Sequence, residues 1–221
     1  MRAIRRRALL LGTTAAALAL GLPDGQAASA PQFHSFLQPA EAAFVDAAVA
    51  RLIPADESGP GAKEAGVTAY IDGQLAGPFG AAATWYMQPP FLDAGPDFDY
   101  QEPQTPAQLY RQAILAIDAY CAASHGKAFA ALPPAAQDAV LTGLEEGHTT
   151  LPGVSGKAFF KLLLANTLEG YWADPVYRGN QGMAGWTLIG FPGARGDYRD
   201  DIEAWGKPYT LPPVDLMGQR A

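Results

Sequence analysis

The stretch Pro39-Ala-Glu-Ala-Ala-Phe-Val-Asp-Ala-Ala-Val-Ala-Arg-Leu-Ile53 has the period of a helix. Its apolar residues Val45, Val49, Leu52 and Ile53 follow at i, i+4, i+7 and i+8, which places them on one stripe. Pro54 ends this helix, because proline lacks a backbone N–H and clashes with the preceding turn. The stretch therefore predicts a helix that is buried along one side.

The same reading extends along the chain. A second helix is predicted over about 62–75, before Gly77-Pro78. Thr105-Pro-Ala-Gln108 has the residues of a helix start, with a capping threonine, proline at the first position and glutamine three residues after the cap. Two more helices are predicted, one after Pro133-Pro134 and a strongly apolar one over 157–167. Residues 77–104 are predicted to be irregular but packed, because they are rich in aromatic residues.

From Gly170 onward, glycine, proline and aspartate recur every few residues between aromatic side chains. No alternation of period two lasts long enough to predict a sheet. The sequence thus predicts a mainly α protein: a compact helical domain whose C-terminal third is an ordered coil with aromatic anchors.

Residues 1–30 have the layout of an export signal. Arginines precede an apolar stretch from Ala8 to about Leu22, and the small-residue tract 27–30 follows. The pair Arg6 and Arg7 before Leu9-Leu10 resembles a twin-arginine signal, with an ordinary arginine-rich secretory signal as the alternative. Cleavage after Ala27 or Ala28 is expected, because Pro31 disfavours a cut after Ala30. Residues 31–221 are then predicted to form a single domain.

Charge excludes some partners. The chain carries a net charge of −7, and removal of the signal, which contributes +3, leaves −10. A surface with this negative charge repels phosphate backbones and anionic lipids. We therefore expect neither nucleic-acid binding nor electrostatic docking on a membrane.

Cys121 is the one cysteine of the chain, so no internal disulfide can form. This chain alone also cannot supply the thiolates of an iron–sulfur cluster, or the Cys-x-x-Cys-His attachment site of a c-type haem. Cys121 is either a buried thiol or the donor of a disulfide to another chain.

No catalytic, cofactor-binding or metal-binding motif is recognisable. The glycine-rich dinucleotide fingerprint, the phosphate-binding loop and the Gly-x-Ser-x-Gly elbow are all absent, and His34, His125 and His148 lie in unrelated segments. Two groups of carboxylates, Asp56, Glu57 and Glu64, and Glu169 and Asp174, are assigned structural roles. We therefore expect no catalytic, cofactor or metal residues in this chain.

Three blocks of sequence resemble the gluconate 2-dehydrogenase subunit 3 family. The first comprises Arg51-Leu-Ile-Pro-Ala-Asp56, Gly59-Pro-Gly-Ala62, Ala65-Gly-Val67 and Tyr70-Ile-Asp72. The middle block is Gln104-Thr-Pro-Ala-Gln-Leu-Tyr-Arg111. The last comprises Phe159-Phe160, Thr167-Leu-Glu-Gly-Tyr-Trp-Ala-Asp-Pro175, Tyr177, Gly179-Asn180, Gly185-Trp186 and Ile189-Gly-Phe-Pro-Gly193. One departure stands out: Arg178 precedes Gly179-Asn180 where the family often has a second glycine.

The resemblance implies a partner system. Members of this family are small subunits of periplasmic or membrane-associated dehydrogenases for gluconate, glucose, fructose, sorbitol and related polyols. A large flavoprotein of the glucose–methanol–choline class carries FAD and the substrate site, and a multihaem cytochrome c often passes electrons onward. The flavoprotein often has no signal of its own, so the small subunit exports it through the twin-arginine translocase.

We thus predict a non-catalytic, periplasmic subunit, attached peripherally to the membrane through its complex, that exports and stabilises a folded FAD dehydrogenase. Tryptophan and tyrosine supply rigid contact area at interfaces, and six aromatic residues are candidates for the docking surface: Trp85, Tyr86, Trp172, Tyr177, Trp186 and Phe191. Two alternatives remain open. One is a stand-alone exported hydrolase using Glu169 and Asp174, and the other is an exported sugar-binding protein that stacks sugars on these aromatic rings.

Overall fold

The computed structural model describes residues 34–92 and 100–221. The predicted signal, with Arg6 and Arg7, lies outside this part of the chain. The helices are α1 (Pro39–Leu52), α2 (Val67–Leu75), α3 (Pro106–His125), α4 (Pro134–Glu145), α5 (Gly156–Trp172) and α6 (Ala184–Ile189). Short 3₁₀ turns, η1 to η4, lie at Phe129–Ala131, Pro175–Tyr177, Gln181–Met183 and Arg199–Asp201. The described residues contain no strand, which confirms the mainly α fold class.

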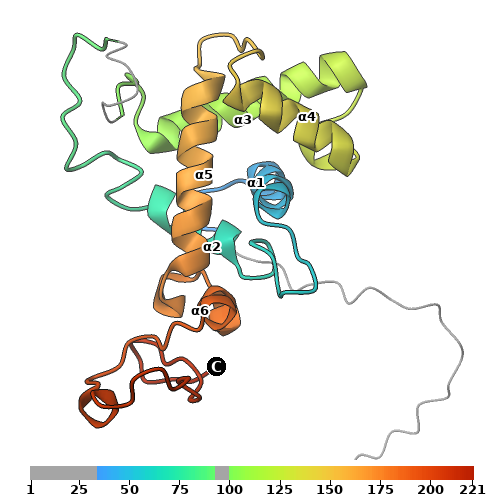
Figure 1. Ribbon diagram of the computed structural model, residues 1–221. Helices are drawn as coiled ribbons and strands as arrows, with labels where there is room; N and C mark the ends of the chain where they lie inside the picture. Colours follow the sequence, from blue (N-terminus) through green and yellow to red (C-terminus); the bar gives the residue numbers. More distant parts are fainter. Residues whose placement is uncertain (1–33, 93–99) are drawn as a thin grey trace, which may run out of the picture. The chain divides into compact units, whose positions relative to one another are not determined.

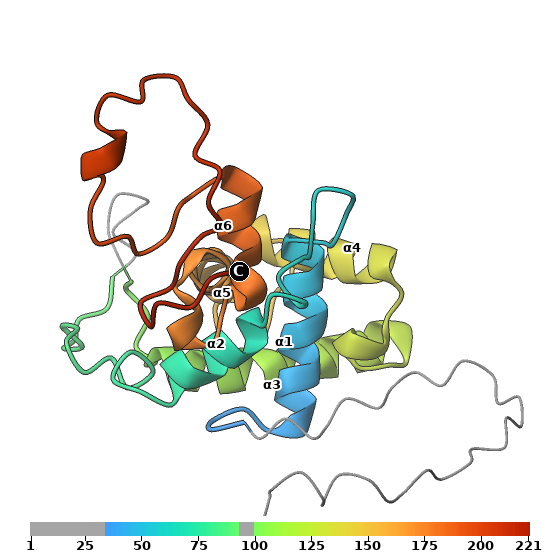
Figure 2. The same cartoon turned by 90° about the horizontal axis from the view of Figure 1, so that it is seen from below.

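Helix α5 is the centre of the arrangement. It packs against each of the other five α-helices, and Figure 1 and Figure 2 show them placed around it. An aromatic cluster fills the core beside it, where the rings of Phe44 and Phe129 lie 4.6 Å apart and those of Tyr110 and Phe159 lie 5.2 Å apart. All four of these rings are buried. The hydroxyl of Tyr110 would be costly to bury unpaired, and the side-chain amide of Asn166 on α5 donates a hydrogen bond to it.

Helix ends follow the sequence signals in several places. Thr105 and Gln108 form the predicted capping box at the start of α3, and Gly126 ends that helix in the left-handed conformation that glycine favours. Helix α1 ends at Leu52, before Pro54.

Two predicted boundaries were wrong, and one short helix was not predicted. The second helix begins at Val67, not near residue 62, because left-handed Gly66 separates it from the preceding turns. Helix α5 continues to Trp172, beyond the predicted end at 167, and its Gly170 packs directly against the ring of Tyr70. Helix α6 lies within the predicted coil, between left-handed residues at both of its ends.

A buried carboxylate anchors the start of the domain. Asp72 on α2 accepts hydrogen bonds from the backbone N–H groups of Ser35, Phe36 and Leu37, at 2.6 to 2.8 Å. Burial alone would raise the pKa of Asp72, but these three donors outweigh it and hold that pKa below its usual value. Segment 35–37 is held further by Arg111 of α3, which donates to the carbonyl of Phe36 and pairs with Glu41.

After α6, the chain forms one short 3₁₀ turn, η4, and is otherwise irregular. The guanidinium of Arg195 lies over the rings of Tyr198 and Tyr209 and pairs with Asp201. Backbone bridges join Gly193 to Val214 and Val214 to Arg220. None of the helices in the described ranges is long and apolar enough to cross a membrane.

Candidate functional site

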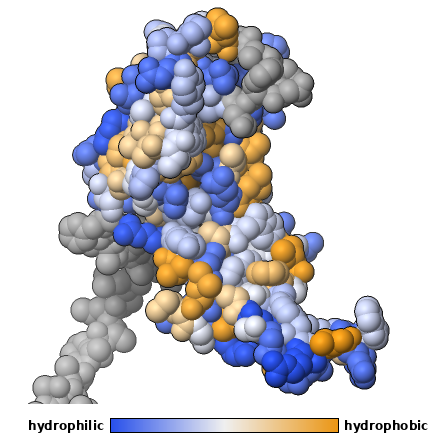
Figure 3. All heavy atoms as spheres, turned by 90° about the vertical axis from the view of Figure 1, so that its left-hand side faces the viewer, coloured by the Kyte–Doolittle hydropathy of each residue, from blue (hydrophilic) through white to orange (hydrophobic). Residues whose placement is uncertain are grey.

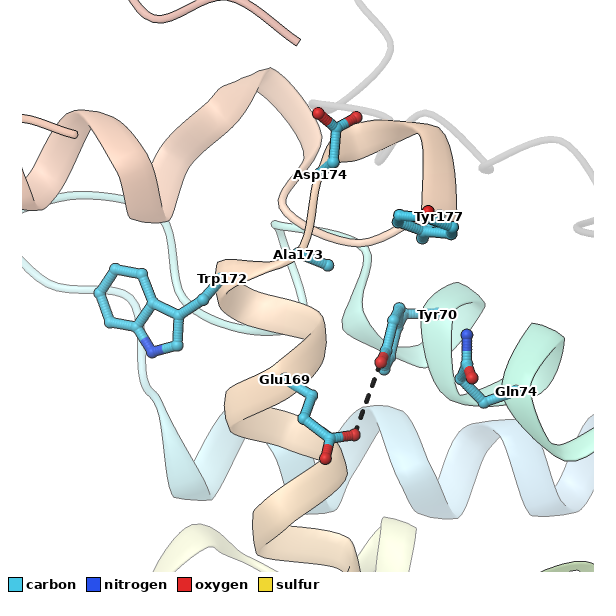
Figure 4. Close-up of a pocket in the computed structure, with 7 residues that line it drawn as sticks. All are labelled: Tyr70, Gln74, Glu169, Trp172, Ala173, Asp174 and Tyr177. Carbon is cyan, nitrogen blue, oxygen red and sulfur yellow. Dashed lines mark hydrogen bonds between the residues drawn. The ribbon is translucent and has the colours of Figure 1, made fainter. Parts of the chain in front are cut away.

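A pocket of about 400 Å³ opens where α2 meets the end of α5 and the turn η2. We call it the α2/α5 pocket. Figure 4 shows the residues that line it: Tyr70, Gln74, Glu169, Trp172, Ala173, Asp174 and Tyr177.

The local sequence explains why these side chains face the pocket. In α2, Val67 and Ile71 point into the core, so Tyr70 and Gln74, four residues apart, share a different side of the helix. In α5, Leu163, Asn166 and Gly170 are buried, while Glu169 and Trp172 remain on the outer side. The pocket therefore uses the faces of two helices that their shared core leaves free.

Close packing holds the end of α5 in place. A Cβ on Gly179 would collide with the carbonyl oxygen of Gly170, so glycine is required there. Asn180 is fully buried; its amide donates to the carbonyl of Ala173 and accepts from the N–H of Gly185. The indole N–H of Trp186 donates to the carbonyl of Trp172.

The carboxyl group of Glu169 is directed at Tyr70, as Figure 4 shows. The residue is exposed, and the hydroxyl of Tyr70 donates a hydrogen bond to its carboxylate over a long 3.5 Å. Partial burial raises the pKa of Glu169 above its usual value, and the Tyr70 hydrogen bond offsets this only in part. Burial and the neighbouring carboxylate likewise raise the pKa of Tyr70 to about 12. Both shifts have the direction expected where partial burial disfavours a negative charge.

Asp174 does not act with Glu169. One of its carboxylate oxygens accepts from the N–H of Val176 and the other from the N–H of Leu216. In Figure 4 its carboxylate points away from that of Glu169. Acid–base hydrolysis by paired carboxylates needs both groups directed at one bond. The geometry therefore does not support the alternative of a hydrolase that uses Glu169 and Asp174.

The six candidate interface aromatics are spread over different environments. Trp172 and Tyr177 line the α2/α5 pocket and are 37% and 55% exposed. Tyr86 is 84% exposed in the segment after α2, whereas Trp85 is half-buried between Phe79 and Tyr100. Trp186 is buried and packs against half-exposed Phe191, so its ring offers little surface to a partner.

Cys121 is fully buried on α3, and burial raises the pKa of its thiol to about 11. A disulfide to another chain would require this thiol to leave the core, and the neutral thiol is a weak nucleophile. The geometry favours a buried thiol, and the intersubunit disulfide stays a prediction.

The other singled-out residues show structural contacts. Asp56 accepts from the N–H of Ser58 within a turn, and His148 lies 3.0 Å from Glu146. In residues 34–92 and 100–221 there is no group of three or more histidine, cysteine or acidic side chains placed to hold a metal ion.

Sequence reasoning assigned no role to Tyr70 and Gln74, and it left Trp205 out of the docking candidates. The spacing of Tyr70 and Gln74 on the polar side of a short helix was the available signal. Trp205 is 87% exposed in the C-terminal segment, where tryptophan on a polar, proline-rich stretch was the corresponding sign.

Taken together, the fold and the pocket define a helical domain with an open aromatic and acidic pocket, built where two distant parts of the chain meet. The sequence model of the family described as gluconate 2-dehydrogenase subunit 3 matches residues 39–193. This is more than half of the chain, and the chain therefore belongs to that family. No curated protein and no solved structure gives a match.

The family's sequence blocks meet in this structure. The hydroxyl of Tyr171 donates to the carbonyl of Pro60, and the N–H of Gln181 donates to the carbonyl of Ala65. Arg178, the departure from the family pattern, has a φ of 76°, in the left-handed region where glycine is favoured. Its guanidinium lies 3.9 Å from the carboxylate of Asp72 and 3.4 Å from the hydroxyl of Ser35, contacts that a glycine would lack.

Family membership indicates an accessory subunit of a gluconate 2-dehydrogenase complex.

Proposed function

We propose that this chain is the non-catalytic small subunit of a periplasmic FAD-dependent dehydrogenase for sugars or sugar acids, and that it exports and stabilises the folded flavoprotein. The observation that carries the proposal is the family match over residues 39–193. FAD belongs to the large subunit, and haem c belongs to a third subunit where one is present.

The surface supports a role in assembly. Large apolar side chains are exposed in two segments of the chain. The first is the end of α5 with the turn η2, and the second is the end of α6 with the residue after its cap: Leu168, Trp172, Val176 and Tyr177 in the first, and Leu188, Ile189 and Phe191 in the second. Figure 3 shows one face of the molecule on which apolar patches alternate with hydrophilic residues. Specific protein interfaces are about as apolar as the remaining surface, so a mixed surface of this kind is compatible with an interface.

The twin-arginine pair gives the proposed route. A translocase that accepts folded proteins suits a flavoprotein that must bind FAD before it crosses the membrane. On this proposal the chain supplies the signal and the bound partner is carried across. The complex then resides in the periplasm, peripherally attached to the membrane.

The test is co-purification from the native host with an affinity tag at the C-terminus of this chain. We expect a large subunit to co-purify, to release FAD on denaturation, and to oxidise gluconate or a related sugar with an artificial electron acceptor. Recovery of the tagged chain alone under gentle conditions would contradict the proposal.

Export is tested separately by the double substitution Arg6→Lys and Arg7→Lys. We expect the flavoprotein to remain active but to accumulate in the cytoplasm. Undiminished activity in the periplasmic fraction would refute the carrier role and leave the subunit role intact.

A further inference from the structure

The charge of Glu169 is unmatched within its pocket. Within the part of the chain that the structure describes, its carboxyl group accepts one hydrogen bond, a long one from Tyr70. No lysine or arginine is among the described residues that line the α2/α5 pocket. Asp174 also lines the pocket, but both of its carboxylate oxygens accept backbone hydrogen bonds, from Val176 and Leu216.

The end of α5 strengthens this negative potential. Backbone dipoles place a partial negative charge at the C-terminus of a helix, where lysine, arginine and histidine are favoured. The last turn of α5 contains no basic residue, and it carries Glu169 instead. A carboxylate at this position interacts unfavourably with the helix dipole, and a cation bound beside it would reverse that effect.

The walls of the pocket fit a cation as well. Tyr70, Trp172 and Tyr177 line it, and the faces of such rings attract ammonium and guanidinium groups. The amide oxygen of Gln74 can accept a further hydrogen bond from the same group.

From these features we propose that the α2/α5 pocket receives a lysine or arginine side chain of the partner flavoprotein, with Glu169 as its counter-ion. The inference rests on the proposed function, since it names the chemistry of the partner that the subunit binds. The exposed apolar residues Leu168 and Val176 are chain neighbours of the pocket residues Glu169 and Tyr177, so a partner docked on the pocket could also contact them.

A neutral sugar fits these observations less well. Sugars also stack on aromatic rings, but they carry no charge to compensate Glu169 and the C-terminus of α5. The electrostatics of the pocket therefore favour a cationic side chain.

The experiment measures the affinity between this subunit and its flavoprotein, both from the co-expressed complex, for the wild type and for Glu169→Gln. Glutamine keeps the size and removes the charge. We expect Kd to rise about tenfold to a hundredfold at low salt, as for the loss of one partner of a close interfacial charge pair. Because salt screens exposed charges, the difference between the two proteins narrows as ionic strength rises.

The matched control is Glu145→Gln, which makes the same charge change at an exposed position at the end of α4. This variant should bind like the wild type. Equal weakening by both variants would show a general charge effect and overturn the inference.

A photo-reactive phenylalanine at position 177 identifies the occupant. We expect it to cross-link to a partner peptide that contains a lysine or arginine next to the attachment point. A peptide without a basic residue there, or unchanged affinity of Glu169→Gln in an intact complex, would overturn the inference while the proposed function stands. If the wild-type chain binds no flavoprotein at all, both fail.

Discussion

Two carboxylates in the same helical framework have opposite environments. Asp72 is buried on α2 and accepts three backbone hydrogen bonds, which keep its pKa low. Glu169 lies in the α2/α5 pocket with one long hydrogen bond, and its pKa is raised. The first charge is satisfied within the chain and serves the fold. The second is not satisfied within the chain, which is the pattern expected of a group that awaits another molecule.

The largest effect is expected at Asp72. Asp72→Asn removes the charge and places an amide N–H donor against backbone N–H groups. The free energy of unfolding should therefore fall by about 3 kcal/mol. Chemical denaturation checks this. Asp118→Asn is the comparison, because Asp118 accepts a single N–H, from Phe129, and a smaller loss is expected there.

The same variant has a defined pH dependence. A carboxyl with a lowered folded pKa stabilises the protein above its unfolded pKa, and this contribution disappears as pH falls through the folded pKa. The stability gap between wild type and Asp72→Asn should therefore close in acid, below the usual aspartate pKa of 3.8. A gap that persists there would mean that lost packing, and not lost charge, causes the effect.

An intermediate effect is expected where the frame of the pocket is tightest. Gly179→Ala places a methyl group against the carbonyl of Gly170, and overpacking of this kind costs about 2 kcal/mol. Because the end of α5 must shift, binding to the flavoprotein should also weaken. Gly153→Ala, in a turn with open space but positive φ, is the control: it strains the backbone without touching the pocket.

The smallest effect on stability is expected at Glu169. The pKa of Glu169 is raised in the folded chain, which means that folding disfavours the ionised carboxylate. The wild type therefore gains stability relative to Glu169→Gln as the pH falls through the folded pKa of Glu169 toward its unfolded pKa. At neutral pH, Glu169→Gln should therefore be as stable as the wild type or slightly more stable. A clear drop in thermal stability would show that Glu169 belongs to the fold, as Asp72 does.

Much of the framework could be predicted because it depends on local chemistry. Apolar spacing identified α1, and a capping box marked the start of α3. Helix boundaries close to a glycine could not be predicted from the local sequence. Gly170 continues α5 because it fits against Tyr70, whereas Gly66 delays α2 through a left-handed turn, and nothing local distinguishes these two glycines.

The sequence also did not predict which aromatic residues are exposed and which are buried. Trp172 and Trp186 occur in similar glycine-rich surroundings in the sequence, yet Trp172 lines the α2/α5 pocket and Trp186 is buried. Burial depends on which surfaces meet after the chain has folded, and hydropathy does not separate two identical side chains.

The amino-acid sequence was enough to establish a helical protein of this family, because helix periodicity and family blocks are properties of residues close together in the chain. Only the tertiary structure separated Asp72 from Glu169. Whether a carboxylate is satisfied depends on donors up to 37 positions away or on a neighbouring helix 99 positions away. These residues, far apart in the sequence, come into contact only when the core forms.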